Sequence, residues 1–459
     1  MSPHRDRLIG HDDVVGSPAP LFPDPAPDAR SERPLVSESR RTTRRVAIDP
    51  SITRHARRRR RNPFATAFRF VAAALAVVLV SGGAVAAYAL WDVAAGVKPA
   101  VTLAGQDPNI PNIDAIEGGV NLLVVGSDSR QGQGMAYGDP EEETGVLNDV
   151  TMLLHISEDH SSAVVVSFPR DLFVPIPECP KLDGTGTYSA MSSQKINTTL
   201  SYGGLACTVL TVEALTGLTI PFAAEVQFNG VIALSNAVGG VEVCVAEPIS
   251  DDYTQTYLDA GMHTLQGKDA LQFLRTRHGV GDGSDLGRIS NQQVFLSSLV
   301  RTLQSSETLS DPGKLFGIAK AATSNMQLSQ SLANLNTMVS IAMALKDIPL
   351  EQIAFLQYPN AYGSSGGEQG VLPLDAAAEQ LFDAIKADKK LSITGTTGVG
   401  SVTDPNAPAD PEAPTDPEST PPATPSAPSA TPPADDAVEL PTTIEGQTAS
   451  DRTCSKGNN

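Results

Sequence analysis

Acidic and basic side chains recur in this sequence beside short apolar runs. The charged residues concerned are Asp128, Arg130, Asp149, Arg170, Asp171, Lys195, Arg275, Arg277, Asp285 and Arg288. The planar guanidinium of arginine can hold phosphate oxygens through two hydrogen bonds. Carboxylates nearby suit Mg²⁺, which takes oxygen ligands and bridges phosphate groups. Together these side chains predict a pyrophosphate site. The alternative is a network of ion pairs that bridges the core, although buried ion pairs add little stability.

Three apolar runs are expected to position the first of these residues. Residues 121–125 are apolar after Asn121 and run into Gly126, which is typical of a buried strand that opens onto a loop carrying Asp128 and Arg130. Residues 147–156 and 163–168 predict two further strands, with Asp149 near the start of one and Arg170 just after the other. These strands are apolar on both faces, as expected for an α/β protein whose sheet is covered on both sides.

The second group of arginines lies between two predicted helices, at 266–274 and 286–306. Arg275 and Arg277 should point the same way if the chain is extended after the first helix. Arg288 and Gln292, four residues apart, share one edge of the second helix near its start. A helix N-terminus favours acids over arginine, so an anionic ligand, such as a phosphate held by free backbone N–H groups, would explain Arg288.

The charge of the chain is divided unevenly along its 459 residues, 41% of which are hydrophobic. Residues 1–69 contain 15 Arg, no Lys and 8 acids, a balance of +7. The other 390 residues carry 18 basic and 44 acidic residues, a balance of −26. A basic N-terminal segment followed by an acidic body is typical of a protein whose two parts lie on opposite sides of a membrane.

Residues 70–90 form an apolar stretch of 21 residues without a charge. About 20 apolar residues span a bilayer, so we expect one transmembrane helix, with the basic cluster at 54–61 on its cytoplasmic side. A cleaved signal peptide is the rival, but the leader of more than 60 residues is too long for a signal n-region. The cluster could also be an arm for DNA or RNA, yet no aromatic residues interleave it and no recognition fold follows. We therefore expect no nucleic acid as a partner.

Four cysteines are present: Cys179, Cys207, Cys244 and Cys454. None has zinc spacing, and a disulfide is the natural use of cysteine outside the cytoplasm. Cys179 and Cys207 flank the Lys-Ile-Asn segment at 195–197, so they are the expected pair. Cys244 is interpreted as a small buried residue in a strand rather than as a nucleophile, and the sequence leaves open whether Cys454 in the tail is free.

The arginines do not belong to a P-loop or to a kinase Gly-rich loop, so a lipid pyrophosphate is a better ligand than a nucleotide. Six segments, in order, then resemble the signature segments of the LytR-CpsA-Psr family. They are NLLVVGSDSR, LNDVTMLLHI, SFPRDLFVPI, KINTTLSYGG, GGVEVCV and LRTRHGVGDGSDLGRISNQQ, within residues 118–306.

The resemblance implies a three-layer α/β/α sandwich around a mixed central sheet, preceded by one transmembrane helix. It implies an apolar pocket for a polyprenyl chain and a Mg²⁺-dependent phosphotransferase. The partners would be the membrane, a polyprenyl-pyrophosphate-linked glycan and peptidoglycan. The glycopolymer would be joined to peptidoglycan by a phosphodiester at the muramic-acid C6 hydroxyl.

Carried over by motif, Asp128 and Asp149 resemble the Mg²⁺ ligands of the family, and Asp285 the residue that orients its arginines. The pyrophosphate would be held by Arg130, Arg170, Lys195, Arg275, Arg277, Arg288 and Gln292, with Asp171 beside them. Many members have an arginine where this chain has Leu147, so either Arg130 substitutes for it or turnover is slower. Asp149 and Asp171 both remain candidates to accept the proton of the attacking hydroxyl.

The expected organisation has six parts. They are a disordered basic cytoplasmic head (1–63), the transmembrane helix (64–91), a stalk (92–117), the catalytic domain (118–306), its helical and strand completion (307–395) and a disordered tail (396–459). The tail is expected to be disordered because residues 400–441 contain 12 prolines. Two other functions remain open: a pyrophosphatase that hydrolyses the lipid carrier, and a non-catalytic wall-binding or regulatory protein.

Overall fold

The computed structural model describes the long N-terminal helix and most of the folded body that follows it. The described residues are 63–95, 98–103, 119–305 (without 135, 136, 138–140 and 143), 312–404, 407 and 437–458. The basic head at 1–62 and most of the proline-rich stretch lie outside them, and what the sequence predicts of those parts stays a prediction.

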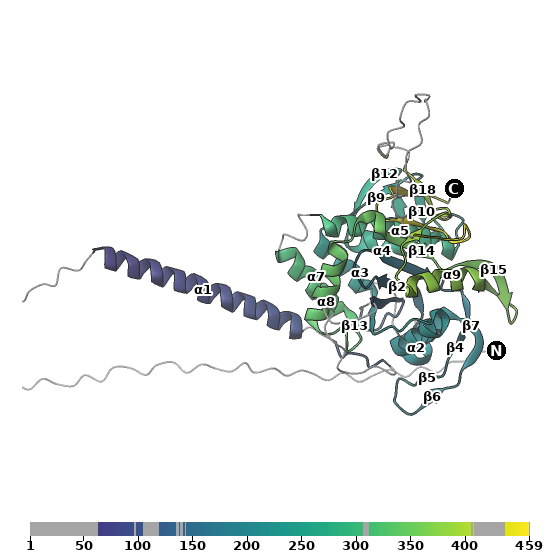
Figure 1. Ribbon diagram of the computed structural model, residues 1–459, viewed down its shortest axis with the longest axis horizontal. Helices are drawn as coiled ribbons and strands as arrows, with labels where there is room; N and C mark the ends of the chain where they lie inside the picture. Colours follow the sequence, from purple (N-terminus) through teal and green to yellow (C-terminus); the bar gives the residue numbers. More distant parts are fainter. Residues whose placement is uncertain are drawn as a thin grey trace, which may run out of the picture. The chain divides into compact units, whose positions relative to one another are not determined.

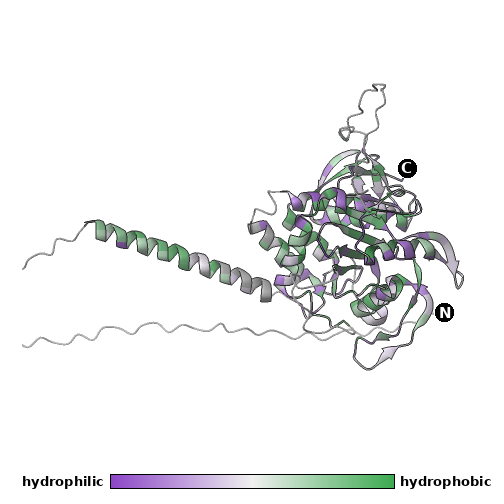
Figure 2. Cartoon of the chain, viewed as in Figure 1, coloured by the Kyte–Doolittle hydropathy of each residue, from purple (hydrophilic) through white to green (hydrophobic). Residues whose placement is uncertain are grey.

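The apolar stretch forms one long helix, α1 (Pro63–Ala95). Within it, Phe64–Val85 has a mean hydropathy of 2.1, and none of its most apolar window is buried. Figure 2 shows mainly apolar residues along the visible side of this helix. Lipid would accept such a surface, because a helix satisfies its own backbone hydrogen bonds. By length and composition, it is the one candidate membrane span in the part of the chain that the structure describes.

The core of the folded body is a mixed sheet of seven strands in the order β13-β8-β1-β2-β3-β14-β20. These strands are β1 (Val120–Ser127), β2 (Asn148–Ile156), β3 (Ala163–Phe168), β8 (Phe222–Val226), β13 (Met326–Leu328), β14 (Ile353–Gln357) and β20 (Gly446–Thr448). β1 runs antiparallel to β2 and parallel to β8, and β3 runs antiparallel to β2 and parallel to β14. The end of β1, the start of β2 and the end of β3 therefore meet at one edge of the sheet.

Helices cover both faces of this sheet, as the α/β/α sandwich requires. They are α2 (Thr199–Thr216) and α9 (Asp375–Lys386) on one face, and α5 (Asp285–Gln304) and α8 (Leu335–Lys346) on the other. Figure 1 shows α2 and α5 on opposite sides of β2 and β14. Leu123 and Val125 pack toward α2, while Val120 and Leu122 pack toward the other face, because successive side chains of a strand alternate. Each such side chain, when fully buried, contributes about 1.5–3 kcal/mol.

The remaining elements surround this sandwich. The helices are α3 (Phe228–Val238), α4 (Gly267–Arg275) and α7 (Pro312–Asn325), with single 3₁₀ turns at Ile196–Thr198 and Leu350–Gln352. The strands are β4 (Phe173–Ile176), β5 (Cys179–Pro180), β6 (Thr187–Tyr188), β7 (Met191–Lys195), β9 (Val241–Val245), β10 (Ile249–Asp251), β11 (Thr256–Leu258), β12 (Gly261–Leu265), β15 (Asn360–Ser365), β16 (Glu368–Pro373), β17 (Leu391–Ser392), β18 (Ser401–Thr403), β19 (Val438–Glu439) and β21 (Thr453–Ser455).

The expected disorder of the tail at 396–459 is wrong for residues 401–403 and 438–455, which contain strands. β18 begins at Ser401, and the chain returns after the proline-rich stretch to form β19, β20 and β21. β20 pairs with β14 at the edge of the central sheet, and β21 pairs with β9 and β18 in a second sheet. The apolar side chains of Leu440, Ile444 and Ala449 are buried there. Their irregular spacing shows neither the strand nor the helix period, so the sequence pattern did not reveal them.

The cysteines form two disulfides. Cys179 and Cys207 are bonded with a Cα–Cα distance of 5.2 Å, which confirms the expected pair. Cys244 and Cys454 are also bonded, so Cys244 is a disulfide partner and not merely a small buried residue, and Cys454, whose state the sequence left open, is not free. The two residues are 210 positions apart and come together only because β21 pairs in parallel with β9.

Candidate active site

The two predicted metal ligands lie where β1 ends and β2 begins. Ser127 pairs with Asn148 across the two strands, which places Asp128 and Asp149 on adjacent strand ends. Asp128 is held in place because its Oδ1 accepts a hydrogen bond from the Leu147 N–H at 2.7 Å. Burial raises the pKa of Asp128, and the nearby charge of Asp149 raises it further, although the Leu147 N–H opposes this. The structure therefore brings together two acids that repel each other.

Arg170 joins this pair from the end of β3, the next strand along. Its Nη1 donates to Asp149 Oδ1 at 2.6 Å, and its Nε lies 3.6 Å from Asp171 Oδ2. Burial by itself lowers the pKa of Arg170, but the carboxylates of Asp149, Asp285 and Asp171 outweigh it and raise the pKa overall. Arg170 is therefore a fixed cation at the edge of the sheet.

Lys195 reaches the same loop from the end of β7. Its Nζ lies 3.1 Å from Asp171 Oδ1 and 5.7 Å from the centre of the Phe173 ring. The turn after Lys195 is tied back by the Asn197 N–H, which donates to the Arg170 carbonyl at 3.2 Å. The Lys-Ile-Asn segment thus supports the loop that carries Arg170 and Asp171.

Arg275 and Arg277 extend from the end of α4 into one cavity, as their alternation predicts. Thr276 between them is buried, and its hydroxyl donates to Asp251 Oδ2 at 2.7 Å. The same carboxylate oxygen accepts from the Arg277 N–H at 3.2 Å. The guanidinium of Arg275 lies over the Phe228 ring, 4.4 Å from its centre, which is a favourable cation–π arrangement. Burial lowers the pKa of Arg275 despite the nearby charge of Asp149.

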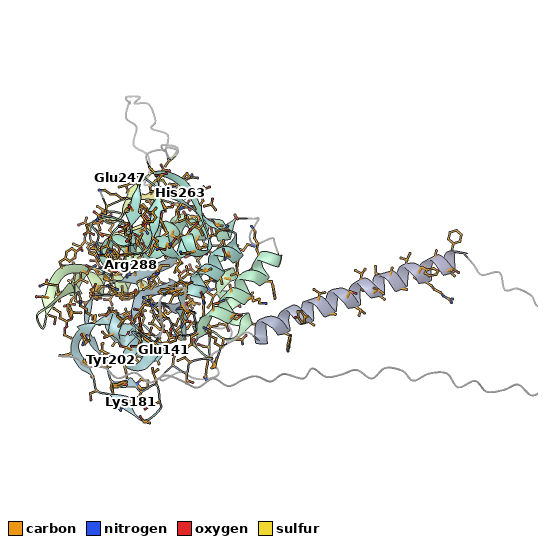
Figure 3. The ribbon with its side chains drawn as sticks, turned by 180° about the vertical axis from the view of Figure 1, so that it is seen from behind. Glu141, Lys181, Tyr202, Glu247, His263 and Arg288 are labelled. Carbon is orange, nitrogen blue, oxygen red and sulfur yellow. A yellow bond between two sulfur atoms is a disulfide. The ribbon has the colours of Figure 1, made fainter. Side chains whose placement is uncertain are left out.

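The first turns of α5 supply Asp285, Arg288 and Gln292. Arg288 is only 6% exposed, and its Nη2 lies 2.5 Å from both Asp285 Oδ1 and the Asp149 carbonyl oxygen. Asp285 Oδ2 accepts from the Arg170 N–H at 3.0 Å, so this acid orients parts of two arginine residues. The Gln292 amide donates to the Leu274 carbonyl at 2.9 Å. Figure 3 labels Arg288 in the interior of the folded body.

These side chains close one end of an amphipathic cavity of about 360 Å³. Its polar lining includes Asp149, Arg170, Arg275, Arg277, Arg288 and Gln292, together with Ser127, Gln227, Asp251, Tyr253, Thr254 and His278. Its apolar lining comes from the sheet and from α3, α4 and α5, and includes Val124, Met152, Phe228, Val231, Leu271, Leu274 and Leu296. The buried Arg288 Nε has no hydrogen-bond partner within the described residues. The cavity suits a molecule with an anionic head and an apolar chain.

Not all of the predicted residues line this cavity. Asp171 and Asp285 line a second cavity of about 250 Å³ instead. Asp128, Arg130 and Lys195 are not in the lining of either cavity as far as the structure describes them. Arg130 donates to the backbone carbonyl of Tyr137 and lies close enough to Asp128 and Arg275 to affect their pKa values. Lys195 contacts Asp171, which lines the smaller cavity.

The donor set at Asp128 and Asp149 fits a hard cation such as Mg²⁺. Mg²⁺ commonly uses one or two carboxylates and fills its other positions with water and phosphate oxygens. Asp128 Oδ1 is occupied by the Leu147 N–H, and Asp149 Oδ1 by Arg170. The raised pKa of the half-buried Asp128 beside a second acid shows that a positive charge would stabilise its ionised form. Elsewhere in the described chain, Cys244, Asp404 and Cys454 lie close together, but their sulfurs are joined and cannot be thiolate ligands.

Sequence reasoning missed three residues of this site. The Phe228 ring lies under the Arg275 guanidinium, Asp251 accepts a hydrogen bond from Thr276 between the two arginines, and the Tyr253 ring lies 4.5 Å from the His278 ring, centre to centre. Asp251 begins an acidic pair, Asp251-Asp252, which is the only sequence signal among these three residues. Phe228 opens an apolar helix and reads as core, so nothing in the pattern distinguishes it.

The fold and the cavity define a class of protein. Its α/β/α domain follows an apolar helix in the sequence and contains an apolar pocket that is also lined by arginines and acids. The profile of the LytR_cpsA_psr family matches residues 93–390, and the chain belongs to this family.

Two relatives and one solved structure illustrate the similarity. The "Cell wall biosynthesis protein LcpA" of Corynebacterium glutamicum is 29% identical over 373 residues, covering 76% of this chain and 70% of the relative. The "Polyisoprenyl-teichoic acid--peptidoglycan teichoic acid transferase TagT" of Bacillus subtilis is 26% identical over 318 residues, covering 67% and 91%. The crystal structure of B. subtilis TagV aligns with a TM-score of 0.47 at 21% identity, covering 60% of this chain and 98% of that one.

Proposed function

We propose that this protein is a membrane-anchored, extracytoplasmic phosphotransferase. It moves a glycopolymer from a polyprenyl-pyrophosphate carrier to peptidoglycan, as a phosphodiester at the muramic-acid C6 hydroxyl. The observation that carries this proposal is the amphipathic cavity, whose arginine end lies beside two acids. The names of LcpA and TagT, one a cell-wall biosynthesis protein and the other a transferase to peptidoglycan, support it.

In this proposal the polyprenyl chain occupies the apolar part of the cavity and the pyrophosphate lies at its charged end. Arg170, Arg275, Arg277 and Arg288 hold the phosphate oxygens, with the planar fork of each guanidinium matching two of them. Asp128 and Asp149 would hold Mg²⁺, which supplies positive charge to the phosphate oxygens when bound. Catalysis then comes mainly from positioning and from charge stabilisation.

The transfer itself is an in-line displacement at the phosphorus nearer the sugar. The acceptor hydroxyl oxygen forms a new P–O bond, and the bond from that phosphorus to the bridging oxygen breaks. The electron pair of the broken bond leaves on polyprenyl phosphate, whose charge the arginines neutralise. The hydroxyl proton passes to a carboxylate, for which Asp149 and Asp171 are the two candidates within reach of the arginines.

The decisive experiment is Asp149→Ala in the full-length protein. We expect loss of Mg²⁺-dependent transfer with retained binding of a polyprenyl pyrophosphate, because burial of the chain does not require the metal. Transfer rate against Mg²⁺ concentration and affinity for the lipid are measured on folded protein. The matched control is Asp259→Ala, an exposed acid outside both cavities. Full activity of Asp149→Ala would refute the proposed site.

The same residues could also use water as the acceptor, which would make the protein a pyrophosphatase. The products separate the two reactions, since only transfer yields peptidoglycan that carries the glycopolymer. Turnover of a polyprenyl-pyrophosphate sugar without any glycan-linked peptidoglycan would favour hydrolysis. Absence of turnover in the folded wild type, with Mg²⁺ supplied, would favour the non-catalytic alternative.

A further inference from the structure

The two cavities meet at a wall made of two ion pairs. Arg170 lies 3.6 Å from Asp171, and Arg288 lies 2.5 Å from Asp285. In both pairs the arginine lines the larger cavity and the acid lines the smaller one. An anion is therefore favoured on one side of the wall and disfavoured on the other. The smaller cavity suits a neutral, hydroxyl-bearing ligand.

The far side of the smaller cavity is the β15–β16 hairpin. The Val371 N–H donates to the Asp171 carbonyl at 3.1 Å, which holds the hairpin against the site. A side chain at Gly370 would bring its Cβ within 2.5 Å of that carbonyl oxygen, so only glycine allows this approach. At the tip, Ser365 and Ser193 are joined through their hydroxyls at 2.7 Å. The hairpin is thus fixed at both ends beside Asp171.

This hairpin presents an aromatic ring and an amide to the cavity. Tyr362 lines the cavity, yet it is 65% exposed, so its ring does not serve to fill the core. Its hydroxyl donates to Asp282 Oδ2 at 3.2 Å, which fixes one edge of the ring. Gln369 adds a side-chain donor and acceptor. An exposed aromatic face with carboxylates and an amide around it can stack on a sugar ring and bind its hydroxyls.

We propose that the smaller cavity is the acceptor subsite and takes one pyranose ring of a glycan strand; this inference rests on the proposed function. Its volume of about 250 Å³ is below the range of about 300–1,000 Å³ typical of small-molecule pockets, which suits one ring of a longer chain. Tyr362 stacks on the ring and Gln369 binds a hydroxyl. The primary hydroxyl points at the wall between the cavities.

The subsite also selects the residue that takes the proton. Asp171 lines the smaller cavity, and Lys195 Nζ holds its Oδ1 at 3.1 Å. The acceptor hydroxyl gives its proton to Asp171 while its oxygen bonds to the phosphorus in the larger cavity. Polyprenyl phosphate leaves with the electrons of the broken P–O bond. Asp149 lines the larger cavity and accepts a hydrogen bond from Arg170, so its role is on the side of the lipid-linked substrate.

The test compares Tyr362→Ala with Tyr257→Ala in the full-length protein in detergent. Tyr257 is a matched control: it is 61% exposed on another hairpin, its hydroxyl donates to Asp252 at 2.9 Å, and it lines neither cavity. With a polyprenyl-pyrophosphate glycan as donor and a soluble peptidoglycan oligosaccharide as acceptor, Tyr362→Ala should raise the acceptor KM about tenfold. The donor KM should not change, and the ratio of transfer to hydrolysis should fall.

Tyr362→Phe keeps the ring and should stay within about twofold of the wild-type acceptor KM, as expected for the loss of one exposed hydrogen bond. Calorimetry with the oligosaccharide alone gives a second readout that needs no turnover, and Tyr362→Ala should bind it more weakly. Unchanged acceptor KM and unchanged oligosaccharide binding in Tyr362→Ala would overturn the subsite alone. A wild type that binds the oligosaccharide but not farnesyl pyrophosphate would instead overturn the proposed function.

Discussion

At the scale of single residues, the arginines of the site are held in place in two different ways. Arg170 and Arg288 are fixed by carboxylates, at 2.6 Å from Asp149 and 2.5 Å from Asp285. Arg275 is fixed by the face of Phe228, and burial lowers its pKa. A bound pyrophosphate would offset the desolvation of the Arg275 charge, because it brings an opposite charge close to it. We therefore expect this arginine to respond most strongly to the ligand.

The first prediction concerns Arg275→Lys and Arg277→Lys. Lysine keeps the charge but cannot present the planar fork, and at position 275 it also loses the flat contact with Phe228. Each lysine substitution should weaken the binding of a polyprenyl pyrophosphate. Replacing either arginine by alanine should reduce the binding free energy by about 1.5–3 kcal/mol. Binding is measured by calorimetry, with the exposed Arg452→Lys as control. Wild-type affinity in both lysine variants would contradict direct contact with phosphate.

The second prediction is a pH effect at Glu225 on β8, which is 8% exposed. Burial raises its pKa above the usual 4.5, although the Ser127 hydroxyl and Lys98 oppose this. A carboxyl whose pKa is raised in the folded state stabilises the fold below its unfolded pKa, and this contribution is lost as the pH rises through its folded pKa. Glu225→Gln removes the charge and keeps an acceptor for Ser127.

Glu225→Gln should therefore melt above the wild type at pH 7, by about 2–4 °C for each kcal/mol recovered. The difference should disappear at about pH 4, where the wild-type carboxyl is protonated as well. Calorimetric melting between pH 4 and 8 checks this, with Glu242→Gln, an exposed glutamate on β9, as control. A difference that does not depend on pH would show that packing, and not charge, is responsible.

At the scale of elements, the C-terminal segment supports the loop between α4 and α5. The Gly281 N–H donates to the Lys456 carbonyl at 2.9 Å, and the Asn458 N–H donates to the Gly279 carbonyl at 3.0 Å. The Asn458 side-chain amide also donates to the His278 carbonyl at 2.9 Å. This loop begins beside the paired arginines, so a segment far along the chain helps to position the site.

The third prediction compares the two disulfides. The bond between Cys244 and Cys454 spans 210 positions and that between Cys179 and Cys207 spans 28, so chain entropy assigns them about 5 and 3–4 kcal/mol. Replacing both members of either pair by serine should lower the free energy of unfolding, measured by urea denaturation.

Only the change at Cys244 and Cys454 should also raise the donor KM, because β21 leads into the contacts with the arginine loop. The variant at Cys179 and Cys207 is the control for stability loss alone. Equal donor KM values in the two variants, measured well below both melting temperatures, would contradict a supporting role for the C-terminal segment.

At the scale of the whole molecule, charge and hydropathy divide the chain at α1. The head carries +7 before it and the rest −26 after it, counted at residue 69. Lys and Arg near a membrane span are retained on the cytoplasmic side, which orients the span. The disulfides in the folded body agree with an oxidising compartment outside. The proposed lipid-linked donor would then meet the site outside the cytoplasm.

The fourth prediction follows from this orientation. Protease added to intact cells stripped of their wall should digest residues 92–459 and spare residues 1–63. Epitope tags at the two ends report the outcome, and a cytoplasmic marker protein controls for lysis. Protection of the body together with loss of the head would reverse the topology. Loss of both tags while the marker survives would also contradict it.

The sequence by itself determined the parts of this protein that depend on local pattern. Apolar runs that end in glycine or proline predict β1 and β3, and their lengths place Asp128 and Arg170 at strand ends. Helical spacing with a closing glycine predicts the end of α2 at Gly217, which adopts φ = 67°. The α/β class, the span and one disulfide follow from similar short-range signals, because each depends on residues within a few turns or on a single long run.

The tertiary structure decided what depends on pairing between distant segments. β20 and β21 are only three residues each, too short to show a period, and they are strands because β14 and β9 offer them hydrogen bonds. That pairing alone brings Cys244 to Cys454. In the same way, Tyr362 and Asp171 are nearly two hundred positions apart in the sequence, and only the packing of the fold brings them to one cavity. A sequence pattern records which side chains share a face, but the contacts between faces are set by the packed fold.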